Sequence, residues 1–133
     1  MRIVLDTNVL VSGLLNPSGF PGRIIDLILG GSITLLYDDR ILAEYEDVLA
    51  RPQLKIEKEL SAGVLGFFRL SGERVTAMPL PSDLSPDPDD VPFMEVALSG
   101  KADALVTGNL KHFKNAPVEV AVLSPNEFIK KLS

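Results

Sequence analysis

Short apolar runs alternate with amphipathic segments along most of the chain. The runs are apolar at successive positions instead of at every second one, which is typical of strands buried on both faces of a parallel sheet. The segments between them repeat apolar residues at helical spacing, and several end at glycine or before proline. Strands are predicted at residues 2–5, 33–37, 74–78, 104–107 and 118–123, and helices at 9–15, 21–29, 40–51, 55–70, about 90–100 and from 124 onward.

This alternation predicts an α/β fold, a three-layer sandwich with a mainly parallel, roughly five-stranded sheet and right-handed crossovers. The 133 residues, 46% of them hydrophobic, suffice for the core of a single domain over residues 1–133. Five prolines between Pro79 and Pro92 predict an ordered, extended approach to the fifth helix. We do not interpret that segment as a domain linker, because neither flank could bury a core of its own.

Composition and charge exclude several kinds of metal-binding and catalytic site. No cysteine is present, which excludes disulfides, thiolate zinc sites and thiol nucleophiles, and the single histidine excludes a multi-histidine metal site. The net charge of -5 argues against a broad basic surface for nucleic acid, although cations held by carboxylates reverse the local sign. No apolar run reaches the roughly 18 residues of a membrane span, so we expect a cytoplasmic protein with no membrane partner.

Ligands bind parallel sheets beyond the carboxyl ends of the strands, where the strand order reverses, and three acids are candidates there. Asp6 directly follows the first strand, and Asp90 opens the fifth helix. Glu44 lies beside the apolar face of the third helix, about 40° from Val48, so its carboxylate is expected along the same sheet edge. Each acid has a structural alternative, since Asp6 and Asp90 could cap helices and Glu44 could be a surface charge.

Polar residues near these acids have two readings as well. Asn8 could orient Asp6 or bond to the local backbone. Thr107 and Asn109 follow the strand at 104–107 and are expected at the same edge, whereas Asp103 precedes that strand and is expected to be structural on the opposite edge. The turn after Asn109 could contact phosphate or form a solvated basic surface through Lys111, His112 and Lys114.

Several hard oxygen donors converging on one edge, without thiol or paired histidine ligands, suit Mg²⁺ or Mn²⁺. Such a site serves phosphodiester hydrolysis well, because one ion lowers the pKa of water and another stabilises the leaving oxygen. No protein nucleophile is required for this reaction.

Four motifs along the chain resemble the PIN domain in order and spacing. They are residues 3–12 (IVLDTNVLVS), Glu44-Tyr45 followed by residues 48–52 (VLARP), Asp90 with Phe93 and Ala97, and residues 102–109 (ADALVTGN). The chain is most similar to the small stand-alone, VapC-like PIN proteins of toxin–antitoxin systems. The resemblance covers essentially the whole chain.

The resemblance implies an endoribonuclease that acts on single-stranded RNA with Mg²⁺ or Mn²⁺. It also implies a homodimer that an antitoxin inhibits. By motif, the metal-binding acids would be Asp6, Glu44 and Asp90, and Thr107 matches the threonine of the family's strand-four motif.

Asn109 departs from the family pattern, because many relatives carry a fourth aspartate there. A neutral amide binds a second cation more weakly, so either Asp87 or Asp89 compensates or only one metal is held firmly. A catalytically weak or inactive regulator that binds RNA or an antitoxin is therefore the alternative function. A phosphatase with Asp6 as covalent nucleophile is a weaker hypothesis, because Asn8 stands where a second aspartate would be expected.

Overall fold

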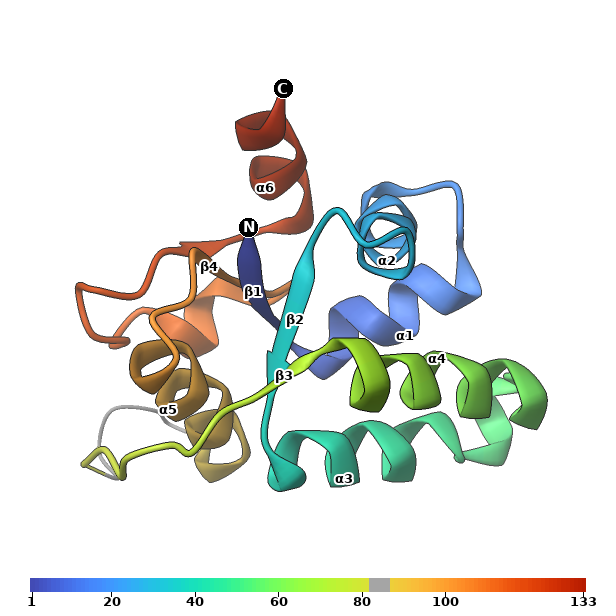
Figure 1. Ribbon diagram of the computed structural model, residues 1–133, viewed down its shortest axis with the longest axis horizontal. Coiled ribbons are helices and arrows are strands. Elements are labelled where there is room, and N and C mark those ends of the chain that lie inside the picture. The colour runs from blue at the N-terminus through green and yellow to red at the C-terminus, as the bar shows by residue number, and fades with distance from the viewer. Residues whose placement is uncertain (82–86) are drawn as a thin grey trace.

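A computed structural model describes residues 1–81 and 87–133 of the chain. Its centre is one sheet in the order β3-β2-β1-β4-β5, and every neighbouring pair of strands is parallel (Figure 1). This confirms the predicted α/β class and the five-stranded parallel sheet. The strands are β1 (Arg2–Leu5), β2 (Thr34–Tyr37), β3 (Glu73–Arg74), β4 (Ala104–Val106) and β5 (Val122–Leu123).

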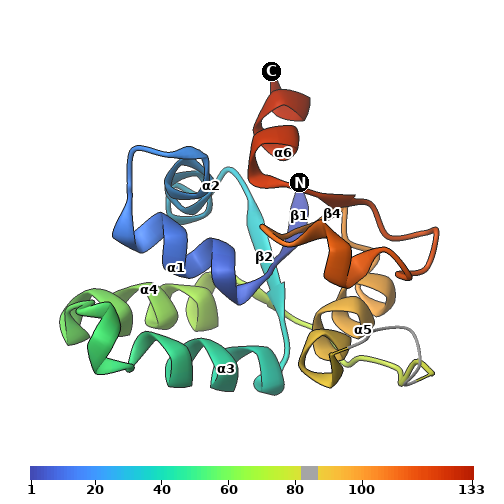
Figure 2. The ribbon, with the colours of Figure 1, turned by 180° about the vertical axis from the view of Figure 1, so that it is seen from behind.

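Helices cover both faces of the sheet and complete the three layers. Figures 1 and 2 show one helix, α5, on one face and the group α1 to α4 on the other. The remaining helix, α6, contacts α2, β4 and β5. The helices are α1 (Thr7–Leu15), α2 (Phe20–Leu29), α3 (Asp39–Leu49), α4 (Lys58–Ser71), α5 (Val91–Ser99) and α6 (Pro125–Leu132), with short 3-10 turns η1 (Pro52–Leu54), η3 (Pro88–Asp90) and η4 (Leu110–Phe113).

The central strands β1 and β4 are the most deeply buried part of the sheet. Ile3, Val4 and Leu5 of β1 are fully buried, and all three residues of β4 are buried as well. Burial on both faces explains why these strands are apolar at every position. The buried Tyr45 of α3 donates its hydroxyl to the Leu5 carbonyl at 2.5 Å, which ties α3 to the end of β1.

The outer strands are shorter than predicted. The strand expected at residues 74–78 is limited to β3, because the chain turns away after the Val75 N–H bonds to the Tyr37 carbonyl at 2.8 Å. At Met78 the backbone N–H already bonds to the Ser99 hydroxyl, at 2.8 Å. The strand expected at residues 118–123 is limited to β5, because Val118 is 96% exposed and a turn joins the Val120 N–H to the Pro117 carbonyl.

Local sequence signals place the helix ends. A capping box begins α6: the Ser124 hydroxyl accepts the Glu127 N–H at 3.1 Å, and the Glu127 carboxylate accepts the Ser124 N–H at 2.8 Å. The first helix begins at Thr7 instead of Val9. The predicted approach at residues 79–92 lies partly outside the described residues, and its last part is the turn η3, which runs directly into α5.

The strand order reverses between β1 and β4, and this reversal fixes the position of the site. The chain leaves β1 toward β2, whereas it leaves β4 toward β5 on the other side. Leu5 pairs with Val106, so Asp6 and Thr107 emerge side by side at the carboxyl edge. Within the described ranges, no helix is long and apolar enough to span a bilayer.

Candidate metal centre

Asp6 is the N-cap residue of α1, but its carboxylate bonds to Thr107 instead of capping the helix. Its backbone has the extended conformation typical of a cap, yet within the described chain its side chain makes no capping bond to the helix amides. The carboxylate instead accepts the Thr107 hydroxyl at 2.7 Å, and the residue is only 7% exposed. The capping alternative for Asp6 is therefore not what the structure shows.

Two further hydrogen bonds fix the loop after β4. The Thr107 hydroxyl accepts the Asn109 N–H at 3.0 Å, so one buried side chain holds both Asp6 and the loop. The Asn8 amide oxygen accepts the Gly108 N–H at 3.2 Å. Asn8 was expected to bond either to Asp6 or to the backbone next to it in sequence, and this bond to Gly108 is neither. The first turn of α1 and the loop after β4 are thus joined beside Asp6.

Glu44 reaches the same edge from α3. It is half-buried, and its carboxylate accepts a hydrogen bond from the hydroxyl of Thr7. Because Thr7 is the residue after Asp6, this contact brings α3 to the start of α1. Sequence reasoning missed Thr7, although its place next to Asp6 in the first motif was a usable signal. Glu46 and Asp47, on the same helix, are exposed.

The aspartates before α5 divide their roles. Asp87 caps the turn η3, where its Oδ1 accepts the Asp89 N–H at 2.9 Å. Asp90 precedes α5 in helical conformation, and its side chain makes no capping bond to the described part of the chain. The Asp90 residue is 7% exposed, and its Oδ2 atom is buried. Asp87 thus caps η3, and the Asp90 carboxylate is directed into the site.

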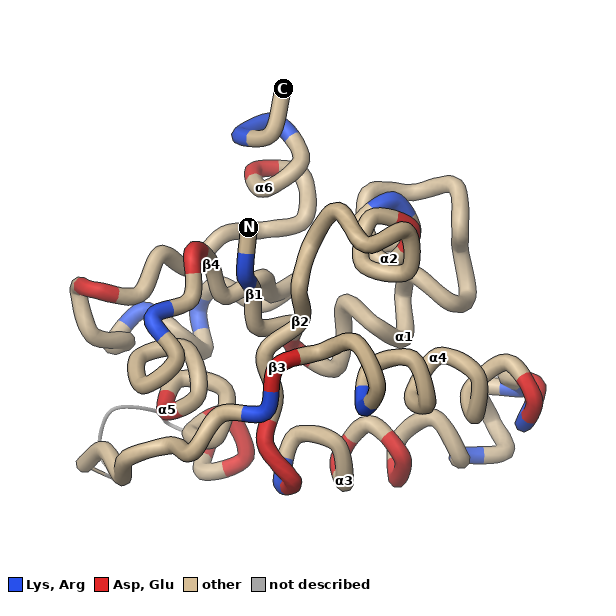
Figure 3. Tube along the Cα trace, viewed as in Figure 1, with Lys and Arg blue, Asp and Glu red and all other residues tan. Residues whose placement is uncertain are grey.

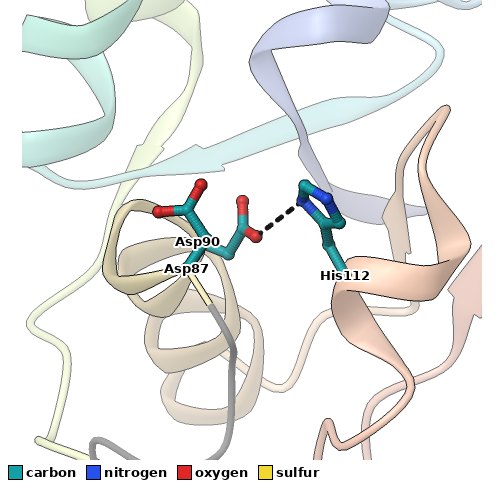
Figure 4. Close-up of side chains that lie close together, drawn as sticks. All are labelled: Asp87, Asp90 and His112. Atoms are coloured by element: carbon teal, nitrogen blue, oxygen red, sulfur yellow. Dashed lines mark ion pairs between the residues drawn. The ribbon is translucent and has the colours of Figure 1, made fainter.

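His112 meets Asp90 from the turn η4. Its Nδ1 atom lies 3.1 Å from Asp90 Oδ2, an ion pair when the imidazole is protonated (Figure 4). One potential ligand atom each from Asp87, Asp90 and His112 lie within 4.8 Å of one another, the only such group of three in the described part of the chain. Sequence reasoning placed His112 in a basic turn and did not pair it with an acid, because 21 residues and a strand separate it from Asp90.

Charges couple the acids of β1, α3 and α5. Burial raises the pKa of Asp6, the Thr107 hydrogen bond lowers it, and the charge of Asp90 raises it again. The pKa of Glu44 is raised by burial and then by the charge of Asp6, although the bond from Thr7 opposes this. The pKa of Asp90 is raised by burial and by the charge of Asp87. The charge and the hydrogen bond of His112 lower it, and the charge of Glu44 raises it to a smaller extent. These carboxylates therefore share one electrostatic environment, although Asp6 and Glu44 lie outside the tightest group of ligand atoms.

The donor set fits a divalent cation. Mutually repelling, partly desolvated carboxylates are costly unless positive charge compensates them. The buried Asp90 Oδ2 atom, whose contact with His112 is charged only when the imidazole is protonated, is the kind of oxygen that such a cation satisfies. Carboxylate oxygens are also the ligands that Mg²⁺ and Mn²⁺ prefer. Figure 3 shows acidic segments along α3 and at the start of α5, two helices that contact each other.

Two other acids are structural. Asp103 accepts the Arg2 backbone N–H at 2.8 Å at the amino end of β1, opposite the site, as predicted. Glu95 is buried on α5, where its carboxylate accepts Arg40 Nη1 and the Leu80 N–H, both at 2.7 Å. Sequence reasoning did not single out Glu95, and its full set of partners explains how α5 tolerates a buried acid.

Comparison with known proteins assigns the family. The PIN domain matches residues 2–111, so the chain belongs to the PIN domain family. The uncharacterized protein MJ1680 of Methanocaldococcus jannaschii is 30% identical over 142 aligned positions, which cover 98% of this chain and 91% of that protein. PIN domains are generally metal-dependent nucleases, and the acidic group at the sheet edge is consistent with that class.

Two solved structures share the fold. VapBC2 from Rickettsia felis, bound to a DNA fragment from its promoter, superposes with a TM-score of 0.57 at 19% identity, covering 93% of this chain and 98% of that one. FitAB bound to an IR36 DNA fragment superposes with a TM-score of 0.62 at 20% identity, covering 92% and 94% of the two chains. At these identities the likeness establishes a common architecture.

Proposed function

We propose that the protein is a divalent-metal-dependent endoribonuclease that cleaves single-stranded RNA and acts as the toxin of a toxin–antitoxin pair. The observation that carries this proposal is the position of the acids at the carboxyl edge of the sheet. Asp6 accepts the Thr107 hydroxyl where β1 and β4 end, and Glu44 accepts the hydroxyl of Thr7, the residue after Asp6. The negative charge of Asp90 raises the pKa of Asp6, and that of Glu44 raises the pKa of Asp90. Membership of the PIN domain family supports the reaction class.

Asp6, Glu44 and Asp90 would hold Mg²⁺ or Mn²⁺. Such an ion, when bound, activates water for attack on a phosphodiester and stabilises charge on the leaving oxygen. Thr107 and Asn8 position this set, Thr107 by its bond to Asp6 and Asn8 by its bond to Gly108. The buried Thr107 hydroxyl keeps one Asp6 oxygen oriented, and this orientation lowers the reorganisation needed for ligation.

RNA would be bound by groups around the acidic centre. Lys111 and Lys114 flank His112 in the turn η4 and just after it, and both are exposed. Their positive charges are suited to the phosphates on either side of the cleaved bond. Asn109, half-buried at the start of this turn, offers an amide in place of a fourth carboxylate. The second cation position would then depend on other ligands.

The likeness to VapBC2 and FitAB supports a proposal about an antitoxin partner. We propose that an antitoxin protein binds this chain and blocks its nuclease activity, and that the free protein is a homodimer in the cytoplasm. Co-expression with a candidate antitoxin tests the first point, since a true antitoxin should co-purify and restore growth of the expressing cells.

The nuclease assay is the direct test. Asp6→Asn should reduce Mn²⁺-dependent cleavage of single-stranded RNA by at least about 100-fold, because it removes a charged ligand but keeps the acceptor for Thr107. Asp103→Asn is the matched control, since this aspartate accepts the Arg2 N–H at the opposite edge of the sheet, and it should cleave as the wild type does. Wild-type cleavage by a folded Asp6→Asn protein would contradict the proposal.

A second candidate function is a catalytically weak or inactive regulator that binds RNA or an antitoxin. Asn109 favours it, because a neutral amide takes the position at which many PIN domains carry an aspartate. Tight RNA binding without cleavage under Mg²⁺, Mn²⁺ or other divalent ions would support this function. Asn109→Asp would then be expected to increase cleavage.

A further inference from the structure

We propose that Asp87, Asp90 and His112 together bind one divalent cation through two carboxylate oxygens and one imidazole nitrogen. This position would favour a divalent transition metal over Mg²⁺. The inference deepens the proposed function, because Asp90 belongs to both ligand sets. It departs from the all-oxygen site that the sequence predicted.

The geometry of the three side chains carries the inference. Their ligand atoms lie within 4.8 Å of one another, and Figure 4 shows the Asp90 carboxylate between the Asp87 carboxylate and the His112 ring. Ligands on opposite sides of an ion with bonds of about 2.1 Å lie about 4.2 Å apart. Small rotations of these side chains are therefore enough to bring all three onto one ion.

The elements that carry these residues are held in place independently. Asp87 is oriented by the Asp89 N–H at 2.9 Å, and the turn η3 leads directly into α5. The turn η4 is anchored by the buried Phe113, and its His112 N–H bonds to the Asn109 carbonyl at 3.1 Å. The ligand group is thus presented by two short turns that approach each other across the end of the sheet.

The surroundings of one Asp90 oxygen are the second observation. Asp90 Oδ2 is buried and faces His112 Nδ1 at 3.1 Å, a contact that is an ion pair when the imidazole is protonated. Buried carboxylate oxygens normally accept hydrogen bonds or bind cations. A metal ion between Asp90 and His112 would satisfy the oxygen and use the imidazole in its neutral form.

The nitrogen ligand determines the metal preference. Mg²⁺ prefers oxygen ligands and retains several waters, whereas imidazole binds first-row transition metals more readily. In this chain the carboxylate missing at Asn109 would be replaced by a nitrogen donor three residues further on. Among the divalent first-row metals, Mn²⁺ should bind this site most weakly, but still more tightly than Mg²⁺ does.

The single histidine of the chain makes the test specific. Untagged protein labelled with ¹⁵N at histidine is loaded with Mn²⁺ and examined by pulsed electron paramagnetic resonance for coupling to a directly bound nitrogen. We expect a histidine nitrogen coupling that is lost in His112→Gln. By calorimetry, His112→Gln and Asp87→Asn should each weaken Mn²⁺ binding about 10-fold or more while changing Mg²⁺ binding much less, and the exposed Asp47→Asn should change neither.

The outcomes separate this inference from the nuclease proposal. Bound Mn²⁺ without histidine coupling, or equal losses of Mg²⁺ and Mn²⁺ affinity in His112→Gln, would overturn the inference and show His112 to be only a charge partner of Asp90. Metal-dependent RNA cleavage by that same protein would leave the nuclease intact. Conversely, a clear histidine coupling in a protein that cleaves no RNA would support the metal site and contradict the nuclease.

Discussion

Thr107 links the acidic centre to the loop that follows β4. Its buried hydroxyl donates to Asp6 and accepts from the Asn109 N–H, and it lowers the pKa of Asp6 against the effect of burial. Position after a buried strand was enough to place Thr107 at the site edge from sequence. The contact of its hydroxyl with Asp6 depends on the pairing of Leu5 with Val106, which only the structure shows.

Replacing Thr107 with valine should therefore have two effects. The free energy of unfolding should fall by about 1–3 kcal/mol, because the half-buried Asn109 N–H and the buried Asp6 carboxylate lose their partner. The pKa of Asp6 should rise further, because a bond that favours the charged form is removed. Urea denaturation and a carboxyl-carbon NMR titration measure these effects. Thr107→Ser should keep most of the wild-type stability and of the wild-type Asp6 pKa. An unchanged Asp6 pKa in the valine variant would contradict the hydrogen bond from Thr107 to Asp6.

At the scale of the elements, the sequence predicts the strands and helices of the core better than those at the sheet edges. β1, β2 and β4 are apolar throughout because both faces are buried, and their positions follow directly from that pattern. β3 and β5 are short, and their limits depend on where a turn redirects the chain, which hydropathy does not encode. The pairing of His112 with Asp90 was missed for the related reason that it joins two turns distant in sequence.

The last helix carries the clearest element-scale prediction. Ser124→Ala removes half of the capping box of α6 and should lower the free energy of unfolding by about 1 kcal/mol. Ser32→Ala, at an exposed position outside any helix or strand, should change it by less than about 0.5 kcal/mol. Equal values for the two variants in urea denaturation would show that the capping box does not stabilise the fold.

For the whole molecule, the acidic centre opposes folding when no cation is bound. The pKa values of Asp6, Glu44 and Asp90 are raised above 3.8, 4.5 and 3.8, so the folded protein binds more protons than the unfolded chain in the range above these values. The stabilising contribution of these groups to the free energy of unfolding is therefore fully present below about pH 4. It is lost as the pH rises through the raised pKa values. A bound divalent ion would compensate the charges that remain.

This linkage predicts how the melting temperature should respond to metal and pH. Mn²⁺ at 100 times its pH 7 dissociation constant should stabilise the fold by about 2.7 kcal/mol near pH 7. It should stabilise the fold by less near pH 4, because protons compete with the metal for carboxylates whose pKa values are raised. In metal-free buffer, Asp6→Asn should lose less stability than the wild type between pH 4 and pH 7. Thermal denaturation measures both effects, and equal stabilisation by Mn²⁺ at the two pH values would contradict the linkage.

Whether Asp6, Glu44 and Asp90 serve a common metal is decided most directly by calorimetric titration of Mn²⁺ into four variants. Asp6→Asn, Glu44→Gln and Asp90→Asn should each weaken binding at least about 10-fold, because each removes a charged ligand from one site. Asp47→Asn, on the exposed side of the same helix as Glu44, should bind as the wild type does. Wild-type affinity in Asp6→Asn and Glu44→Gln would contradict the shared site.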